Sequence, residues 1–290
     1  MKKTFAFIGT GFLASLVGAA RLVAAGDVER VGVSAEADEA YVQLRQTAEG
    51  LREETYIFAQ GQFFPGESTE SSLLTIPFER MVEPLAHGLA RQNFYPTSDQ
   101  ESADLLITVH WGVTKPARFD EVVEEDVLNR TQDALDNQPE DPALIDYGLM
   151  NELSATQENI SSGVDQEVME NARMLGYLPI VLEERKRSHQ AGRGNAQTPT
   201  AKLMAMERYF IILTAWDNQL IQSSGERQLR WVVRCNLPAL GHRFADAVPA
   251  LIRVGSEYYG RNLRTPVTVR TNLGPGRVKV TEPGVIGIED

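Results

Sequence analysis

Four polar side chains on two strand-like runs have the types and the spacing to bind an anion. Thr108 and His110 lie two positions apart in one run, and Arg230 and Arg234 lie four positions apart in another. Because side chains alternate between the two faces of a strand, each pair lies on one face. If the faces coincide, they form a polar, cationic patch whose arginines are bidentate donors to an anionic ligand. The other interpretation is a sheet face that is exposed to solvent or covered by the rest of the chain.

A second candidate site lies near the N-terminus, where Gly9 and Gly11 belong to a G-x-G-x-x-A sequence ending at Ala14. This sequence resembles the opening of NAD(P)-binding Rossmann domains, in which such glycines let the backbone approach a pyrophosphate at a helix N-terminus. The resemblance implies strands over Thr4–Ile8 and Glu29–Ser34, NAD(P) as cofactor and a cytoplasmic oxidoreductase. The family places a ribose-binding acid at the end of the second strand, and this chain has none there.

The same stretch also has the three parts of a secretory signal peptide. Lys2 and Lys3 give a positive start, and Phe5–Val17 is an uncharged, apolar run of thirteen residues. A helix that spans a bilayer needs about 20 residues, so the run is too short to do so. Small side chains at Val23-Ala24-Ala25 favour cleavage after Ala25. This interpretation places the protein in the periplasm or outside the cell.

Most known catalytic and metal-binding motifs are absent from the sequence. It contains no G-x-S-x-G, H-E-x-x-H or G-x-x-x-x-G-K-[ST] sequence, and its four histidines include no pair spaced by four residues. The single cysteine, Cys235, excludes an internal disulfide, a cysteine zinc site and a lipoprotein anchor at the cleavage point. It lies in an apolar run, where we expect a buried and unreactive thiol. These features favour a non-catalytic protein without a cofactor or metal.

The acidic residues are concentrated in one segment. The net charge is −12, and residues 120–170 contain fifteen acidic side chains and one basic one. This balance argues against nucleic-acid binding, which needs a basic face. The carboxylates lack the D-x-D-x-D-G spacing of a calcium loop, so we interpret them as a solvated face, with Ca²⁺ or a cationic partner as the alternative. The basic cluster Arg185–Arg187 either docks against nearby acids or touches anionic lipid.

Hydrophobic patterns predict the elements that must position these side chains. We expect strands over Glu54–Phe64, Asp104–Lys115, Arg208–Trp216 and Gln228–Leu237, and helices over the apolar stripes that begin at Phe78 and Phe244. The order is strand, helix, strand, insertion, strand, strand, helix. It predicts an α+β fold, with helices on one face of a small, largely antiparallel sheet. No apolar run after Ala25 reaches bilayer length, so no transmembrane span is expected after signal removal.

The chain divides accordingly into five segments. They are a signal peptide (1–25), the first part of the α+β domain (26–115), an acidic, partly helical insertion (116–207), the second part of the domain (208–263) and a hairpin or extended tail (264–290).

The order of Tyr56-Ile57-Phe58, the amphipathic helix, the run Ala103–Val109 and the two closing strands resembles small bacterial envelope domains. These domains are exported or lipid-anchored proteins of Gram-negative bacteria, and the resemblance brings no catalytic residues. The likeness covers about half of the chain after residue 25. This chain differs from such domains in lacking the lipidation cysteine and in carrying the large insertion. We therefore predict an exported, non-catalytic binding or assembly module, with another envelope protein or an anionic ligand as its partner. The oxidoreductase remains the alternative.

Overall fold

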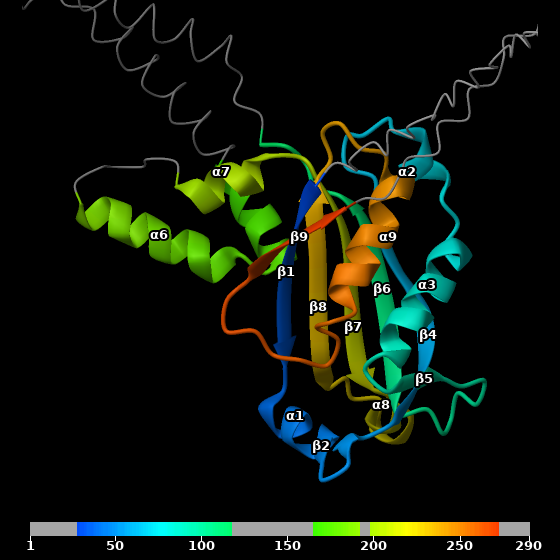
Figure 1. Ribbon diagram of the computed structural model, residues 1–290. Helices are drawn as coiled ribbons and strands as arrows, with labels where there is room; N and C mark the ends of the chain where they lie inside the picture. Colours follow the sequence, from blue (N-terminus) through cyan, green and yellow to red (C-terminus); the bar gives the residue numbers. More distant parts are fainter. Residues whose placement is uncertain (1–27, 118–164, 192–197, 273–290) are drawn as a thin grey trace, which may run out of the picture.

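A computed structural model describes residues 28–117, 165–191 and 198–272 of the chain (Figure 1). The centre of the molecule is a seven-stranded sheet in the order β5-β4-β6-β7-β8-β1-β9. Its strands are β1 (Val28–Ala37), β4 (Glu54–Phe64), β5 (Phe94–Pro96), β6 (Leu105–Val113), β7 (Arg208–Asp217), β8 (Leu229–Pro238) and β9 (Val267–Asn272). Two short strands, β2 (Gln46–Thr47) and β3 (Gly50–Leu51), pair with each other outside this sheet.

The sheet is mixed. β4 runs parallel to β5 and β6, whereas every other neighbouring pair is antiparallel. Parallel neighbours need a connection that crosses back over the sheet, and α2 (Ser71–Thr75) and α3 (Glu79–Ala90) lie in the connection between β4 and β6. β1 is the first strand of the described residues, yet it lies between β8 and β9, the last two described strands. Strands from both ends of the described chain therefore meet in one half of the sheet.

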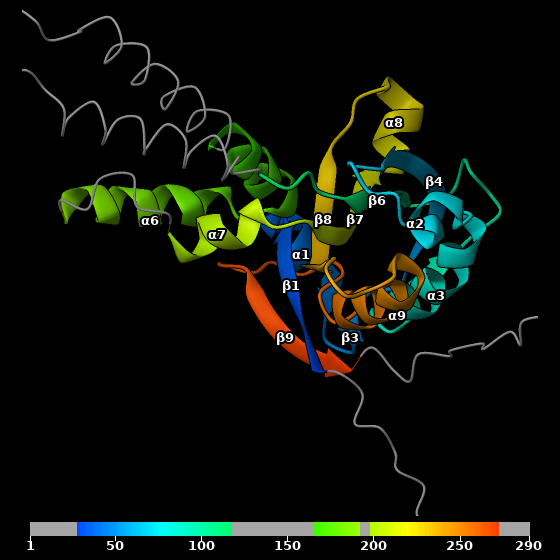
Figure 2. The ribbon, with the colours of Figure 1, turned by 90° about the horizontal axis from the view of Figure 1, so that it is seen from above.

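The main hydrophobic core lies between the sheet and the helices α2, α3 and α9 (Phe244–Gly255), which cover one face (Figure 2). The inward residues of β6 alternate along the strand, with Ile107 and Val109 fully buried. In α3, Met81, Leu85 and Leu89 recur every four residues and are fully buried too. Both periods are those that the sequence predicts for these two elements.

A second hydrophobic cluster lies on the opposite face of the sheet. Residues 165–175 are helical, and together with α6 (Leu178–Gln190) and α7 (Pro199–Ala205) they pack on outward residues of β7 and β8. Among these outward residues are Phe210 and Ile212, so both faces of β7 are covered, as its nearly continuous apolar sequence predicts. The helices α1 (Glu39–Arg45) and α8 (Asn218–Ser224) lie at the end of the strands that is opposite α7 (Figure 1).

The prediction of a small, largely antiparallel sheet with helices on one face is wrong. The sheet has seven strands, contains parallel pairs and carries helices on both faces. The predicted order also conflicts with the structure, because it leaves out β1, β5 and β9. β1 was missed because Val28–Ala37 carries Glu29, Arg30 and two alanines, and it forms a strand through pairing on both sides rather than through a strongly apolar sequence.

The position of β1 also bears on the alternative oxidoreductase. The strand that the Rossmann resemblance predicts over Glu29–Ser34 does lie within β1. A Rossmann domain would give this strand a parallel neighbour. Here β8 and β9 occupy both of its edges, and both are antiparallel to it. Gly9 and Gly11 themselves lie outside the described residues, as do the predicted signal peptide and most of the acidic segment.

In the part of the chain that the structure describes, no helix combines the length and the apolar composition that a membrane span requires.

Candidate functional site

A groove of about 470 Å³ runs between β1, α6 and the segment that leads into β9. Pockets for small ligands usually measure about 300–1,000 Å³. Its lining mixes apolar and charged side chains, and α6 contributes both kinds, for example Ile180 and Glu183. The apolar lining consists of Ala35, Pro179, Ile180, Leu263 and Pro266, and the charged lining of Glu36, Glu183, Glu184, Arg187 and Arg264. The groove can therefore take a small ligand that carries both apolar and charged groups.

Two glycines allow residues 165–190, the described helical part of the predicted insertion, to approach β1 closely enough to form this groove. A Cβ atom on Gly32 would lie 2.3 Å from the Tyr177 hydroxyl oxygen, and one on Gly176 would lie 2.1 Å from Ser34 Oγ. Both distances are far below a van der Waals contact. Gly176 also has a φ of +80°, a conformation that favours glycine. A side chain at either position would push the insertion away from the strand.

Arg234 lies beside the groove and contacts two of the residues that line it, Ser34 and Glu36. Its Nη1 atom is 2.5 Å from Glu36 Oε1 and 3.4 Å from Ser34 Oγ. The Arg234 side chain is 18% exposed, whereas that of Glu36 is 59% exposed. The guanidinium is thus held in place by a carboxylate that can move into solvent. An anionic group of a ligand could take the position of this carboxylate and bond the same guanidinium.

The helical wall of the groove is fixed by its own polar contacts. Glu184 accepts hydrogen bonds from the Thr200 hydroxyl at 2.8 Å and the Thr200 amide at 3.1 Å, which tie α6 to α7. Burial disfavours the charge of Glu184, but the hydrogen bonds from Thr198 and Thr200 outweigh this effect and lower the pKa of its carboxyl.

Two arginines of the basic cluster Arg185–Arg187 pair with acids, as one of the two interpretations of that cluster predicts. The pairs are Arg185–Asp165 and Arg187–Glu183.

A buried cation, Arg208, is the first residue of β7 and lies next to β8. Arg208 is 2% exposed, its Nε donates to Asn236 Oδ1 at 2.7 Å, and its Nη1 has no hydrogen-bond partner among the described residues. Burial lowers the pKa of Arg208 to about 10, so the side chain keeps its charge at neutral pH. Among the described residues no carboxylate forms an ion pair with it. Sequence reasoning did not single out Arg208, because a charged residue at the start of a strand normally lies in solvent.

The structure places all four residues of the predicted patch on the face of the sheet opposite α3 and α9. His110 lies in the same cross-strand row as Arg234, with Ile212 between them, so about 10 Å separates their backbones. Arg230 lies four residues before Arg234, about 14 Å along the strand. Only Arg234 adjoins the groove. The binding role of the four residues together remains a proposal.

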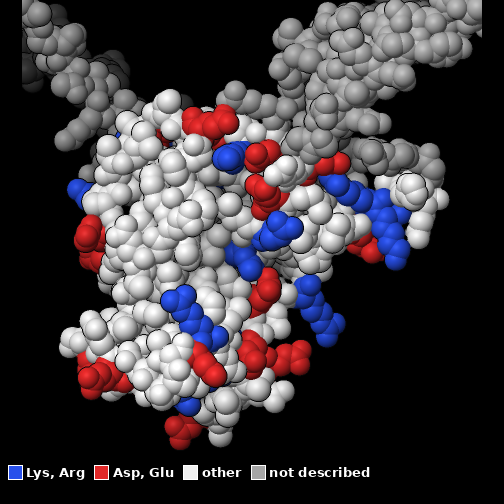
Figure 3. All heavy atoms as spheres, turned by 180° about the vertical axis from the view of Figure 1, so that it is seen from behind, with Lys and Arg blue, Asp and Glu red and all other residues white. Residues whose placement is uncertain are grey.

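The charge of this patch is more balanced than the sequence indicates. Arg230 forms an ion pair with Asp217, to which its Nε donates at 3.1 Å, and Arg234 pairs with Glu36. Figure 3 views this side of the molecule: acidic and basic side chains are interspersed along its middle, beside a broad uncharged surface. An anion would therefore bind by displacing a carboxylate.

His110 has a structural contact of its own. Its Nδ1 accepts a hydrogen bond from the Gln62 amide at 2.9 Å, at the point where the pairing of β4 and β6 shifts register. Burial lowers the pKa of His110, which keeps the imidazole neutral and Nδ1 available as an acceptor. His110 therefore holds the irregular end of β4 in place.

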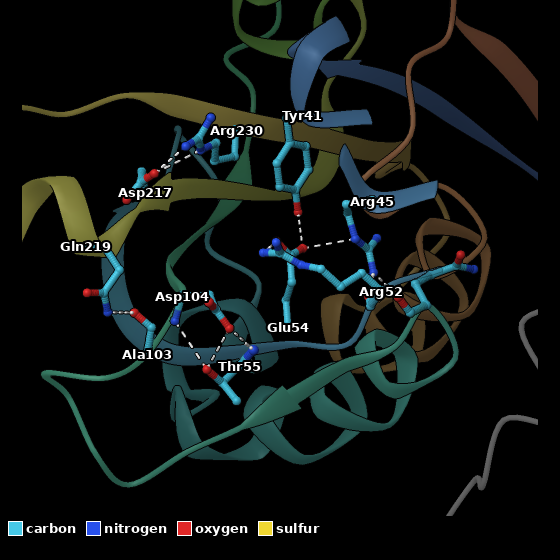
Figure 4. A network of polar contacts seen from close by, with 11 residues as sticks. Tyr41, Arg45, Arg52, Glu54, Thr55, Ala103, Asp104, Asp217, Gln219 and Arg230 are labelled. Carbon is cyan, nitrogen blue, oxygen red and sulfur yellow. Dashed lines mark hydrogen bonds and ion pairs between the residues drawn. The ribbon is translucent and has the colours of Figure 1, made fainter. Parts of the chain in front are cut away.

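A buried polar network at the opposite end of the strands was not predicted from the sequence (Figure 4). Glu54 accepts a hydrogen bond from the Tyr41 hydroxyl at 2.5 Å and forms ion pairs with Arg45 at 2.9 Å and Arg52 at 3.0 Å. Arg45 also donates to the Gln92 carbonyl at 2.6 Å. Burial lowers the pKa of the Arg45 guanidinium, and its interactions with Tyr41 and Glu54 oppose that shift. The network attaches α1 to the end of the sheet. The residues lie far apart in the sequence, so no spacing rule connects them.

No group of three or more His, Cys, Asp or Glu side chains that could hold a metal ion occurs in the described ranges. Cys235 is buried, and burial raises the pKa of its thiol to about 12.

Comparison with known proteins gives no family for this chain. No protein-family model matches the sequence, and no curated protein does. Among solved structures, a PDZ domain protein from Parabacteroides distasonis matches with a TM-score of 0.36 and 9% identity; the match covers 84% of this chain and 39% of that one. A DUF4136 family protein from Bacteroides thetaiotaomicron matches with a TM-score of 0.32 and 12% identity, covering 78% and 93% of the two chains. Likeness at TM-scores this low supports no conclusion about this chain, and the resemblance to envelope domains stays a prediction.

Proposed function

We propose that this protein is an exported, non-catalytic binding module of the bacterial cell envelope, and that it holds a small amphipathic anion in the groove beside Arg234. The observation that carries the proposal is the groove itself, with its apolar lining residues and its adjoining guanidinium. Its volume of about 470 Å³ suits a ligand of modest size.

The ligand's acidic group would bind Arg234 in place of Glu36. Because Glu36 is largely exposed, its carboxylate regains solvation when it leaves the pair, and the exchange of one anion for another costs little. The apolar part of the ligand would lie against Ile180 and Leu263. Arg234 is already oriented by the Ser34 hydroxyl, so little conformational entropy is lost on binding.

The chemistry of the residues also supports a binding role. Cys235 is buried with a raised thiol pKa, which makes it a poor nucleophile. The Nδ1 atom of His110 is occupied by a main-chain hydrogen bond. Arg230 is engaged in its pair with Asp217.

The ligand site is tested by titrating the purified protein with the fluorescent anion anilinonaphthalene sulfonate. We expect Arg234→Ala to weaken binding about tenfold and Glu36→Gln, which removes the competing carboxylate, to strengthen it a few-fold. Arg227→Ala, an exposed position just before β8, is the matched control and should leave binding unchanged. Equal affinities of the wild type, the Arg234 variant and the Glu36 variant would overturn the proposal. If Arg230→Ala weakens binding as much as Arg234→Ala, the anion spans the four-residue sheet patch instead.

Export is tested separately. The full sequence is expressed in a Gram-negative host, the periplasm is released by osmotic shock, and the intact mass of the protein is measured. We expect the mass of a chain that begins at Gly26, as the leader from Lys2 to Ala25 predicts. A cytoplasmic protein that begins at Met1 would contradict export, and tight binding of NADH by that protein would favour the oxidoreductase.

A further inference from the structure

The edge of the sheet at β4 is only partly paired. β5 pairs with Glu54–Tyr56 alone, although β4 continues to Phe64. The last bond to this edge runs from the Thr97 amide to the Tyr56 carbonyl, and the Glu54 amide bonds the Asn93 carbonyl on the same edge. Backbone groups of a strand point to alternate sides every residue, so the N–H and C=O groups of Phe58 and Gln60 also point to this edge.

Within the described residues, neither Phe58 nor Gln60 has a backbone partner on that edge. Two donors and two acceptors are therefore arranged there as another strand would need them. The register shift after Gln60 ends the regular edge, and proteins often use such irregularities to stop unwanted strand pairing. The free edge is thus short and limited to these two residues.

A small pocket of about 260 Å³ adjoins this edge; Gln60 and Glu79 belong to its lining, together with apolar residues such as Leu74 and Trp111. Part of its wall is aromatic. The ring centroids of Phe63 and Phe78 each lie 5.7 Å from the ring centroid of Trp111. Leu74, at the rim, is 50% exposed, which is unusual for a leucine beside so many apolar neighbours. The pocket has room for one large apolar side chain next to the free backbone groups.

The surroundings of the pocket are acidic. The stretch 66–83 carries four glutamates and one arginine, and Glu79 belongs to the pocket lining. Glu67, Glu79 and Glu83 are exposed. Basic residues on either side of an apolar one would complement this charge.

We propose that this edge binds an extended peptide segment of a partner protein, in which basic residues flank a large apolar side chain. The peptide backbone bonds Phe58 and Gln60 as an added strand, and its apolar side chain fills the pocket under Leu74 and Trp111. Backbone pairing gives such complexes affinity, and side-chain pockets give them specificity. The site lies at the opposite edge of the sheet from β9, away from the groove, so the proposal goes beyond the function proposed above and stands independently of the groove's ligand.

The test uses fluorescence anisotropy of a labelled peptide, Lys-Val-Lys-Phe-Lys-Val-Lys, titrated with the full protein. Because the Gln60 amide points away from β6, Gln60→Pro removes the edge donor without removing a bond of the β4–β6 ladder. We expect Gln60→Pro to weaken binding at least about tenfold, and the matched control Gln60→Thr, which keeps the amide, to bind like the wild type. Leu74→Lys, which adds a positive charge at the rim and removes an apolar contact, should weaken binding by a similar factor.

Melting temperatures of the variants show whether each one is folded. If Gln60→Pro is destabilised, Leu74→Lys, at a half-exposed position, still decides about the pocket. Hydrogen exchange of the wild type should show that the peptide slows exchange at the Phe58 and Gln60 amides and not at those of β9. No binding by the wild type, protection of β9 instead of β4, or unchanged affinity in a folded Gln60→Pro variant would overturn the proposal.

Discussion

The hydroxyl oxygen of Tyr177 lies where a side chain on Gly32 would begin. A Cβ atom at position 32 would be 2.3 Å from it, whereas the next nearest atoms, in the Asn236 amide, are 3.1 and 3.2 Å away. The tyrosine oxygen is buried and has no hydrogen-bond partner within the part of the chain that the structure describes. One glycine in β1 thus sets how closely the helical insertion approaches the sheet.

Gly32→Ala should therefore destabilise the protein and displace the insertion. Forcing an extra carbon into a packed interface costs about 1–3 kcal/mol. We expect the free energy of unfolding in urea to fall by that amount and the groove beside Arg234 to lose affinity for its probe anion. Unchanged stability would show that the insertion is not packed against β1 as described.

Tyr177→Phe should partly restore the Gly32→Ala variant, because it removes the atom that clashes. Alone, Tyr177→Phe removes a hydroxyl that no described residue hydrogen-bonds, so the change should be nearly neutral. In a double-mutant cycle the two changes should couple by about 1 kcal/mol, with the double variant more stable than the sum of the single effects. Additive effects would place the clash elsewhere.

The contact between Gly32 and Tyr177 also shows where sequence reasoning stops. Strands such as β6 and the helix α3 are readable because the period of their apolar residues matches the faces that they bury. β1 is not readable in this way, because partners about 200 residues later in the chain decide its pairing. Alternation places Thr108 with His110 on one face of their strand and Arg230 with Arg234 on one face of theirs. That the two faces coincide, and that the two arginines pair with Asp217 and Glu36, depends on which strands become neighbours.

His110 should make part of the stability depend on pH. Burial lowers the pKa of the folded-state imidazole below the usual value of about 6.5, so the unfolded chain binds a proton more readily. This contribution is fully present above about pH 6.5 and is lost as the pH falls toward the lower folded-state pKa. Urea unfolding of the wild type and His110→Gln from pH 5 to pH 8 measures it. The stability advantage of the wild type, about 1 kcal/mol at pH 8, should shrink at pH 5; a constant difference would contradict this account.

Cys235 should react only in the unfolded chain. The thiol is buried between the sheet and α9, and its raised pKa, about 12, leaves almost no thiolate at neutral pH. Iodoacetamide at pH 7.5 should leave the mass of the native protein unchanged for hours and add one carbamidomethyl group in 6 M guanidinium chloride. Rapid labelling of the native protein would mean that this part of the core opens.

Glu54 should be among the most sensitive positions in the protein. Its side chain is 3% exposed and is the carboxylate partner of Arg45, which is also 3% exposed. Glu54→Gln keeps the size and removes the charge, so Arg45 is left buried without its counter-ion at a cost of about 3–5 kcal/mol. Glu53→Gln, a change of the same type at the exposed neighbouring position, should alter the stability by less than about 0.5 kcal/mol. Chemical unfolding of the two variants gives the comparison. Similar stabilities would mean that α1 is held by its apolar contacts through Tyr41 alone, and that the ion pairs of Glu54 contribute nothing to the attachment.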